Sequence, residues 1–95
     1  MLLRDAEPAD PEIHYMIALE RAKDGDLTQA LAGFDECIRL DPEFHYAYYH
    51  KAVTLDTAGR REEARRVAAD GVEHARDAAD PKAYSELTGL LDTLQ

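Results

Sequence analysis

The sequence predicts an all-α fold of two helix–turn–helix repeats followed by a terminal helix, and three observations support this prediction. Apolar residues recur at helical spacing in five segments, Asp-Pro pairs and glycines mark helix starts and stops, and small or apolar residues recur at an offset of 34. The pairs at this offset are Ala18 and Ala52, Gly25 and Gly59, Ala30 and Ala64, Phe34 and Ala68, Cys37 and Gly71, and Ile38 and Val72. Thirty-four residues are the length of a unit of two antiparallel helices.

The first repeat is expected over residues 11–44. Asp10 can cap a helix whose first residue is Pro11, and Gly25 supplies a left-handed residue after its end, so we predict a helix over Pro11–Lys23. In this helix Ile13, Ile17 and Ala18 are expected to face inward. A second helix over Thr28–Leu40 carries an apolar stripe of Leu27, Ala30, Leu31, Phe34, Cys37 and Ile38. Residues 1–9 show no periodicity, and we expect them to form a flexible segment ahead of a domain over 10–95.

The second repeat, expected over 45–78, and a capping helix within 80–95 complete the domain. We predict helices over Glu43–Thr57, ending at Gly59, and over Glu62–Asp77, with Ala64, Val67, Ala68, Gly71, Val72 and Ala75 on one face. The last helix, Pro81–Thr93, places Tyr84, Leu87, Leu90, Leu91 and Leu94 on one stripe and polar residues on the other. A one-sided terminal helix of this kind covers the open face at the end of a repeat array.

At these positions the sequence resembles the tetratricopeptide repeat family. The first repeat supplies Ile17-Ala18, Gly25-Asp26, Ala30, Phe34 and Leu40-Asp41-Pro42, with Cys37 in place of a second alanine. The second supplies Tyr48, Ala52, Leu55, Gly59, Ala64 and Gly71. His14, Arg21 and Lys51 depart from the motif. The second repeat also lacks the terminal Pro, which favours a longer second helix in that repeat. The resemblance implies a short right-handed superhelix that acts as a non-enzymatic protein–protein interaction module.

Composition narrows the classes of partner. The net charge of −9 opposes binding to nucleic acid and to anionic membranes, because phosphate affinity rests on Lys and Arg. No apolar run approaches the ~20 residues of a membrane-spanning helix, and the N-terminus lacks the apolar core of a signal peptide. A single cysteine, Cys37, excludes an internal disulfide. We therefore expect a cytoplasmic protein.

No catalytic, cofactor-binding or metal-binding residues are expected. A two-histidine site on a helix needs a spacing of four, whereas His45 and His50 are five apart, and no second histidine stands four residues from His14 or His74. Cys37 occupies a small buried position of the repeat, so a packed thiol is favoured over a nucleophile. The basic cluster at 60–66 also contains Glu62 and Glu63, so we expect its charges to neutralise one another on a solvated helix face.

The family resemblance further implies a concave ligand groove lined by the first helix of each repeat. Carried onto this sequence, its positions include Tyr15, Met16, Leu19, Tyr46, Tyr49, His50 and Val53. The expected ligand is a peptide or helix of a protein partner with basic and apolar residues. Two alternatives stay open. The N-terminal segment or the last helix covers these residues, or an exposed apolar face pairs with a second copy to form a homodimer.

Overall fold

The computed structural model describes residues 9–95, and these form five α-helices without a β-strand. The helices are α2 (Pro11–Lys23), α3 (Leu27–Leu40), α4 (His45–Thr57), α5 (Arg61–Asp77) and α6 (Pro81–Thr93). Each begins and ends within two residues of its predicted range, and the predicted all-α class is confirmed. Of the expected flexible segment 1–9, all but Ala9 lies outside the described residues. None of the helices in 9–95 is long and apolar enough to cross a membrane.

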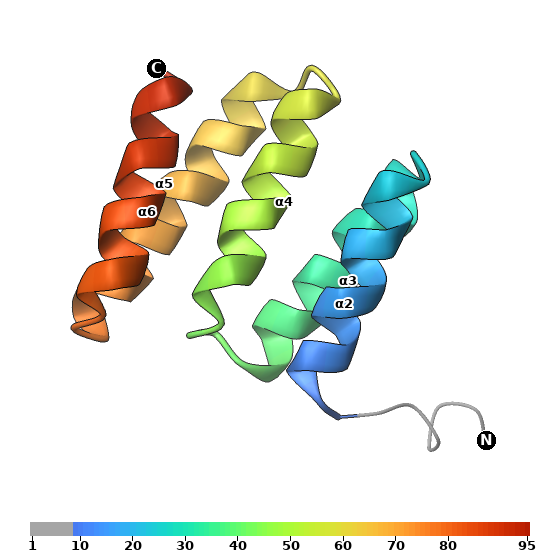
Figure 1. Ribbon diagram of the computed structural model, residues 1–95, viewed down its shortest axis with the longest axis horizontal. Helices are drawn as coiled ribbons and strands as arrows, with labels where there is room; N and C mark the ends of the chain where they lie inside the picture. Colours follow the sequence, from blue (N-terminus) through green and yellow to red (C-terminus); the bar gives the residue numbers. More distant parts are fainter. Residues whose placement is uncertain (1–8) are drawn as a thin grey trace.

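The helices form two layers (Figure 1). Helices α2, α4 and α6 lie in front in this view and run in the same direction, whereas α3 and α5 run back behind them. The Cα trace extends over 43 × 30 × 16 Å, a flat shape that fits two layers of helices. Along the chain, each front helix therefore alternates with a back helix, as in an array of helix hairpins.

Short side-chain caps and glycines set the helix ends. Asp10, Asp26 and Asp80 each accept a hydrogen bond at Oδ1 from a backbone N–H in the first turn of α2, α3 and α6. Gly25 and Gly59 follow α2 and α4 with φ of +81° and +82°, a conformation that costs other residues a Cβ clash.

The start of α4 differs from the prediction. Asp41 accepts a hydrogen bond from Glu43 N, but this closes a turn, and the helix begins two residues later, at His45.

The core forms between the two layers. Phe34 is fully buried with Ala18, Ala30, Cys37 and Ala47, so the first repeat and the start of the second share one apolar cluster. Two small residues permit this packing. A Cβ added to Gly33 would stand 2.9 Å from Ala18 Cβ, and one added to Gly71 would stand 2.8 Å from Tyr48 Cβ.

One predicted inward stripe is wrong. Ala18 is buried as expected, but Ile13 and Ile17 are 39% and 48% exposed. Their counterparts one repeat later are Ala47, which is buried in the first core cluster, and Lys51, whose Nζ lies 2.6 Å from Asp35 Oδ1 of α3. This side of a front helix is thus covered by the back helix before it, and within residues 9–95 no helix precedes α2.

The last helix is held along its length and at both ends. Leu87 and Leu94 are 1% exposed against α4 and α5, whereas Tyr84, expected on the same stripe, is 40% exposed and Ala83 is buried in its place. Arg61 donates to the carbonyl oxygens of Thr93 and Leu94, and Arg65 also donates to Leu94. The basic cluster therefore does more than neutralise itself. Its acids are nevertheless paired within the cluster, Glu62 with Arg65 and Glu63 with Arg60.

Candidate functional site

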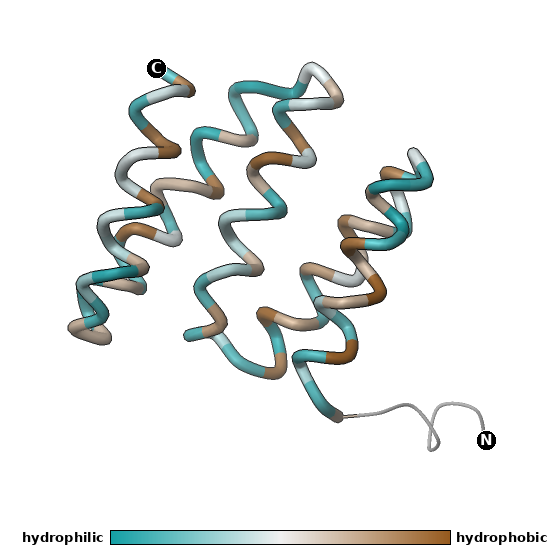
Figure 2. Tube along the Cα trace, viewed as in Figure 1, coloured by the Kyte–Doolittle hydropathy of each residue, from teal (hydrophilic) through white to brown (hydrophobic). Residues whose placement is uncertain are grey.

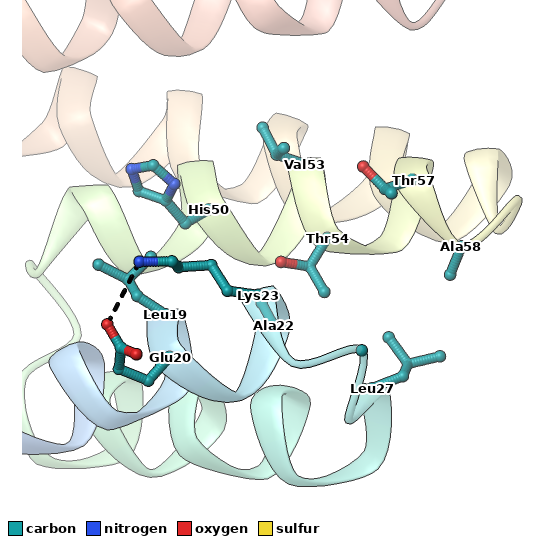
Figure 3. A pocket seen from close by; sticks show the side chains of 11 residues that line it. Leu19, Glu20, Ala22, Lys23, Leu27, His50, Val53, Thr54, Thr57 and Ala58 are labelled. Atoms are coloured by element: carbon teal, nitrogen blue, oxygen red, sulfur yellow. Dashed lines mark ion pairs between the residues drawn. The ribbon is translucent and has the colours of Figure 1, made fainter.

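Two hollows lie side by side on the layer of α2, α4 and α6, and His50 lines both. The first, of about 550 Å³, lies between α2 and α4 (Figure 3) and is lined by Leu19, Glu20, Ala22, Lys23, Gly25, Leu27, His50, Val53, Thr54, Thr57 and Ala58. The second, of about 650 Å³, lies between α4 and α6 and is lined by Tyr46, Tyr49, His50, Ser85, Glu86, Gly89, Leu90 and Thr93. We call these two hollows together the groove.

The first hollow exists because front helices pack on back helices more than on each other. α2 packs mainly on α3, and α4 mainly on α5, which leaves a wedge between α2 and α4. Its walls are largely apolar, with Leu19 and Leu27 on one side and Val53 on the other. Glu20 and Lys23 form an exposed ion pair of 3.5 Å at the rim (Figure 3). An exposed pair of this kind contributes little stability, so both side chains remain free to move aside for a ligand.

The second hollow has an aromatic wall and a wall of small polar residues. Tyr46 is 40% exposed on α4, while Ser85, Glu86 and Gly89 line the opposite side on α6. A Cβ added at Gly89 would meet no atom within 4 Å. The surface of α6 is therefore open here, and another backbone could approach it closely.

His50 stands at the centre of the groove in an aromatic setting. Its ring centroid lies 5.8 Å from that of Tyr15 and 5.3 Å from that of Tyr49, both in edge contacts. Burial lowers the pKa of His50, so the neutral imidazole is the main form at neutral pH. The charged side chains that line the groove are then Glu20, Lys23 and Glu86, which leaves a small negative balance.

The structure brings five of the seven sequence-predicted site residues into the groove. Leu19, His50 and Val53 line the first hollow, and Tyr46, Tyr49 and His50 line the second. Tyr15 lies outside both linings, with its ring 5.0 Å from Phe44 and 6.2 Å from Phe34, and burial raises its pKa. Met16 lines neither hollow and is 56% exposed. Tyr49 is half-buried, because it also packs against the cluster that contains Tyr48 and Leu87.

Sequence reasoning missed the contribution of α6. Its polar face was read only as the solvent side of a cap, yet Ser85, Glu86, Gly89 and Thr93 line the second hollow. A signal was present, since Ser85, Gly89 and Thr93 are spaced by four and form a strip of small side chains on one helix face.

Few side chains in residues 9–95 could act as a nucleophile or hold a metal ion. Cys37 is fully buried, and burial raises the pKa of its thiol to about 11, so the nucleophilic thiolate is scarce at neutral pH. Within residues 9–95, no cluster of His, Cys, Asp and Glu could hold a metal ion. His45 is buried with Nδ1 3.4 Å from Asp80 Oδ2, where it joins the starts of α4 and α6.

Comparison with known proteins identifies the architecture. A tetratricopeptide repeat domain protein from Salinibacter ruber, in a solution NMR structure, is 31% identical, covers 94% of this chain and 90% of its own, and superimposes with a TM-score of 0.85. A crystal structure of a tetratricopeptide repeat domain protein from the same organism is 32% identical, with coverage of 90% and 94% and a TM-score of 0.78.

A sequence relative and a family model add to this likeness. An uncharacterized protein of Methanocaldococcus jannaschii is 39% identical over 54 residues, which are 57% of this chain and 63% of that protein, so the chain spans less than two thirds of this relative. The family model described as tetratricopeptide repeat matches residues 21–91. Members of this family generally mediate protein–protein interaction and are not enzymes. The chain belongs to the tetratricopeptide repeat family.

Proposed function

We propose that this protein is a non-enzymatic binding module that holds an extended or helical segment of a protein partner in the groove. The observation that carries the proposal is the continuity of the groove, because His50 lines both hollows and two neighbouring side chains of one segment could fill them together. Hollows of 300–1,000 Å³ with apolar walls and a few polar groups are typical of ligand sites.

The two hollows favour different partner side chains. The first, with Leu19, Leu27 and Val53 in its walls, suits a large aliphatic or aromatic anchor. The second suits a side chain that stacks on Tyr46 and offers a cation to Glu86. The family's carboxylate clamp, which uses Lys, Arg and Asn, has no equivalent here, since the corresponding positions hold Tyr15, Leu19 and His50. A free C-terminus is therefore not the expected ligand.

Charge favours a partner segment with Lys or Arg beside its apolar anchors. The net charge of −9 attracts such a segment over a distance, and the neutral His50 offers no opposing cation. Attraction of this kind mainly raises the association rate and weakens with salt, because the Debye length is about 10 Å at 0.1 M. The apolar anchors mainly set the dissociation rate.

Selection from a random displayed-peptide library against the full chain tests the proposal. The enriched peptides should carry an apolar residue with Lys or Arg nearby, and their amide chemical-shift perturbations should centre on residues that line the groove. Perturbations confined to α3 and α5 would contradict the groove assignment.

A matched pair of tyrosines supplies the control. Tyr46 and Tyr84 are both 40% exposed, but Tyr46 lines the groove and Tyr84 lies outside it, beside Ala75, Arg76 and Pro81. Tyr46→Ala should weaken binding of a selected peptide by about 2 kcal/mol, roughly 30-fold, if it is a hot spot. Tyr84→Ala should leave affinity unchanged. Equal losses in both variants would indicate a general effect on folding or surface charge rather than a groove contact.

A further inference from the structure

His50 is a histidine that stands at the junction of the two hollows without an ion-pair partner. Among residues 9–95, it is the one side chain that lines both hollows. Its ring makes edge contacts with the rings of Tyr15 and Tyr49, at centroid distances of 5.8 Å and 5.3 Å. The imidazole of His45 has a carboxylate 3.4 Å away on Asp80, whereas His50 forms no ion pair within residues 9–95. A proton on His50 therefore adds a positive charge at the centre of the groove that no paired carboxylate neutralises.

Few charged groups face His50 across the groove. The titratable and charged side chains that line the hollows or contact its ring are Tyr15, Glu20, Lys23, Tyr46, Tyr49 and Glu86. They come from α2, α4 and α6, because α3 adds only Leu27 to the linings and α5 adds no residue. Glu20 and Lys23 pair with each other at 3.5 Å, so Glu86 is the one acid of the linings that has no basic partner within residues 9–95. The negative balance of the groove thus depends on Glu86.

We propose that His50 makes the binding of a basic partner segment depend on pH, because its neutral imidazole accommodates the partner's Lys or Arg and its protonated imidazole excludes it. This inference deepens the proposed groove function and rests on it. With a neutral His50, Glu86 is the excess acid and attracts a cation that stacks on Tyr46. With a protonated His50, the negative balance of the linings is cancelled, and the imidazolium competes with the partner's cation for Glu86. Like charges held close together in an interface weaken binding.

The surroundings of His50 already disfavour its charged form. Burial lowers the pKa of His50 below the ordinary value of 6.5. Figure 3 shows the His50 side chain projecting from α4 at the part of the hollow where Leu19 and Lys23 stand on α2, and Figure 2 shows hydrophobic residues recurring along α2. A bound segment would cover the imidazole further and bring a second cation near it, and both changes lower its pKa again.

Partner binding and protonation of His50 are therefore expected to oppose each other. A partner that binds mainly to the neutral form releases a proton from His50, and by the same coupling a proton weakens the binding of the partner. The affinity should be constant above pH 6.5, and it should fall as the pH drops through the folded-state pKa, which lies below that value. An acidic segment would respond in the opposite direction, because it gains from the imidazolium.

Nuclear magnetic resonance titration of the full chain tests the inference directly. The probe is a peptide enriched from the displayed library at about pH 7.5, synthesised with blocked ends and without Asp, Glu or His. Imidazole resonances are followed from about pH 7.5 to about pH 5.0, a range that spans histidine titration and lies above that of ordinary carboxylates. The pKa of His50 should be lower in the complex than in the free chain. A pKa of His50 that stays the same or rises on binding overturns the proposal.

Calorimetry measures the same coupling as an affinity. The dissociation constant of the peptide, expressed per folded chain with the folded fraction taken from circular dichroism, should rise at least about threefold between about pH 7.5 and about pH 5.0. His50→Gln cannot take up this proton, so its dissociation constant should not change with pH, whatever its value. His74→Gln, on α5 and outside the groove, is the matched control and should keep the wild-type rise. A constant affinity in the wild type, or an equal rise in His50→Gln, sinks the inference.

A second peptide, in which each Lys and Arg is replaced by Gln, tests the role of the partner's charge. Its dissociation constant should change less with pH than that of the basic peptide, and an equal change would contradict the exclusion of cations by His50. Amide chemical-shift perturbations separate this inference from the groove proposal. Perturbations centred on the groove without a lower pKa of His50 leave the groove function standing and remove its pH dependence. Perturbations confined to α3 and α5 contradict both.

Discussion

Helices α2 and α6 occupy equivalent places at the two ends of the molecule, but their apolar side chains are buried to different extents. At the C-terminal end, α6 buries Leu87 and Leu94, its N-terminus is capped by Asp80, and its last carbonyls accept hydrogen bonds from Arg61 and Arg65. At the N-terminal end, α2 packs Ala18, Tyr15 and Leu19 inward, yet it leaves Ile13, Met16 and Ile17 exposed. Within residues 9–95, the C-terminal end of the array is thus covered by α6, whereas no helix packs on Ile13, Met16 and Ile17 of α2.

Removing the closed end should have the largest effect. Deletion of 80–95 takes Leu87 and Leu94 from their clusters and exposes Ala64, Ala68 and Ala75 of α5. We expect aggregation or loss of cooperative thermal unfolding, because a repeat with an open apolar face is not independently stable. A soluble 1–79 fragment that unfolds cooperatively, as seen by calorimetry, would show that α6 is an appendage.

Equivalent positions at the two ends allow a matched measurement. Ile17, Lys51 and Leu87 are each the seventh residue of a front helix, and Leu87 is 1% exposed where Ile17 is 48% exposed. Leu87→Ala should lower the free energy of unfolding by about 2–5 kcal/mol through a cavity, and Ile17→Ala by less than about 1 kcal/mol in the monomer. Urea unfolding at low protein concentration gives both values. Similar losses at the two sites would mean that the face of α2 is covered even in the monomer.

The arginine contacts to the end of α6 should contribute a smaller amount. Arg61 and Arg65 side chains are 53% and 34% exposed, so solvent screens much of their interaction with the carbonyls. We expect the double variant Arg61→Ala/Arg65→Ala to lose about 1 kcal/mol of stability. Hydrogen exchange should rise mainly in the last turn of α6. The exposed Arg66→Ala serves as the control, and an equal loss there would point to helix propensity or net charge as the cause.

The smallest effect on stability should come from protonation of His50, which lies on α4 between the two ends of the molecule. Its pKa in the folded state is lowered by burial below the ordinary value of 6.5, so the unfolded chain binds a proton more readily. Stability should therefore fall as the pH drops below 6.5 towards the folded-state pKa, and this contribution should be absent above 6.5. His50→Gln should reduce the loss of melting temperature between about pH 7.5 and about pH 5.5, a range that spans histidine titration. An identical pH dependence in both proteins would show that His50 stays solvated.

Local chemistry accounts for most of what the sequence predicted correctly. Asp10 and Asp80 cap the helices that begin at Pro11 and Pro81, and Gly25 and Gly59 end helices by their freedom at positive φ. The offset of 34 places Ala18 with Ala52 and Ala30 with Ala64, and all four are fully buried. These features depend on neighbours within a few residues or on a repeated pattern, so they can be read from one chain.

The groove could be predicted only in part. Leu19, His50 and Val53 were found because a family position fixes their place on a front helix, and the structure puts all three around one hollow. The share of α6 in the second hollow was not found, because it depends on how closely α6 lies beside α4. Periodicity assigns a residue to a side of its own helix but does not say which helix faces it.

The sequence by itself determined the number, limits and order of the helices and the period that relates them, because capping, glycine conformation and helical spacing act locally. Only the tertiary structure decided which apolar side of α2 faces the core. Tyr15, Ala18 and Leu19 compete with Ile13, Met16 and Ile17, and apolar residues on both sides of a helix leave its rotation undefined. The contact of Arg61 with Thr93, 32 residues away, could not be predicted from the sequence either. Both outcomes depend on the presence or absence of a neighbouring helix, and that is a property of the packed array.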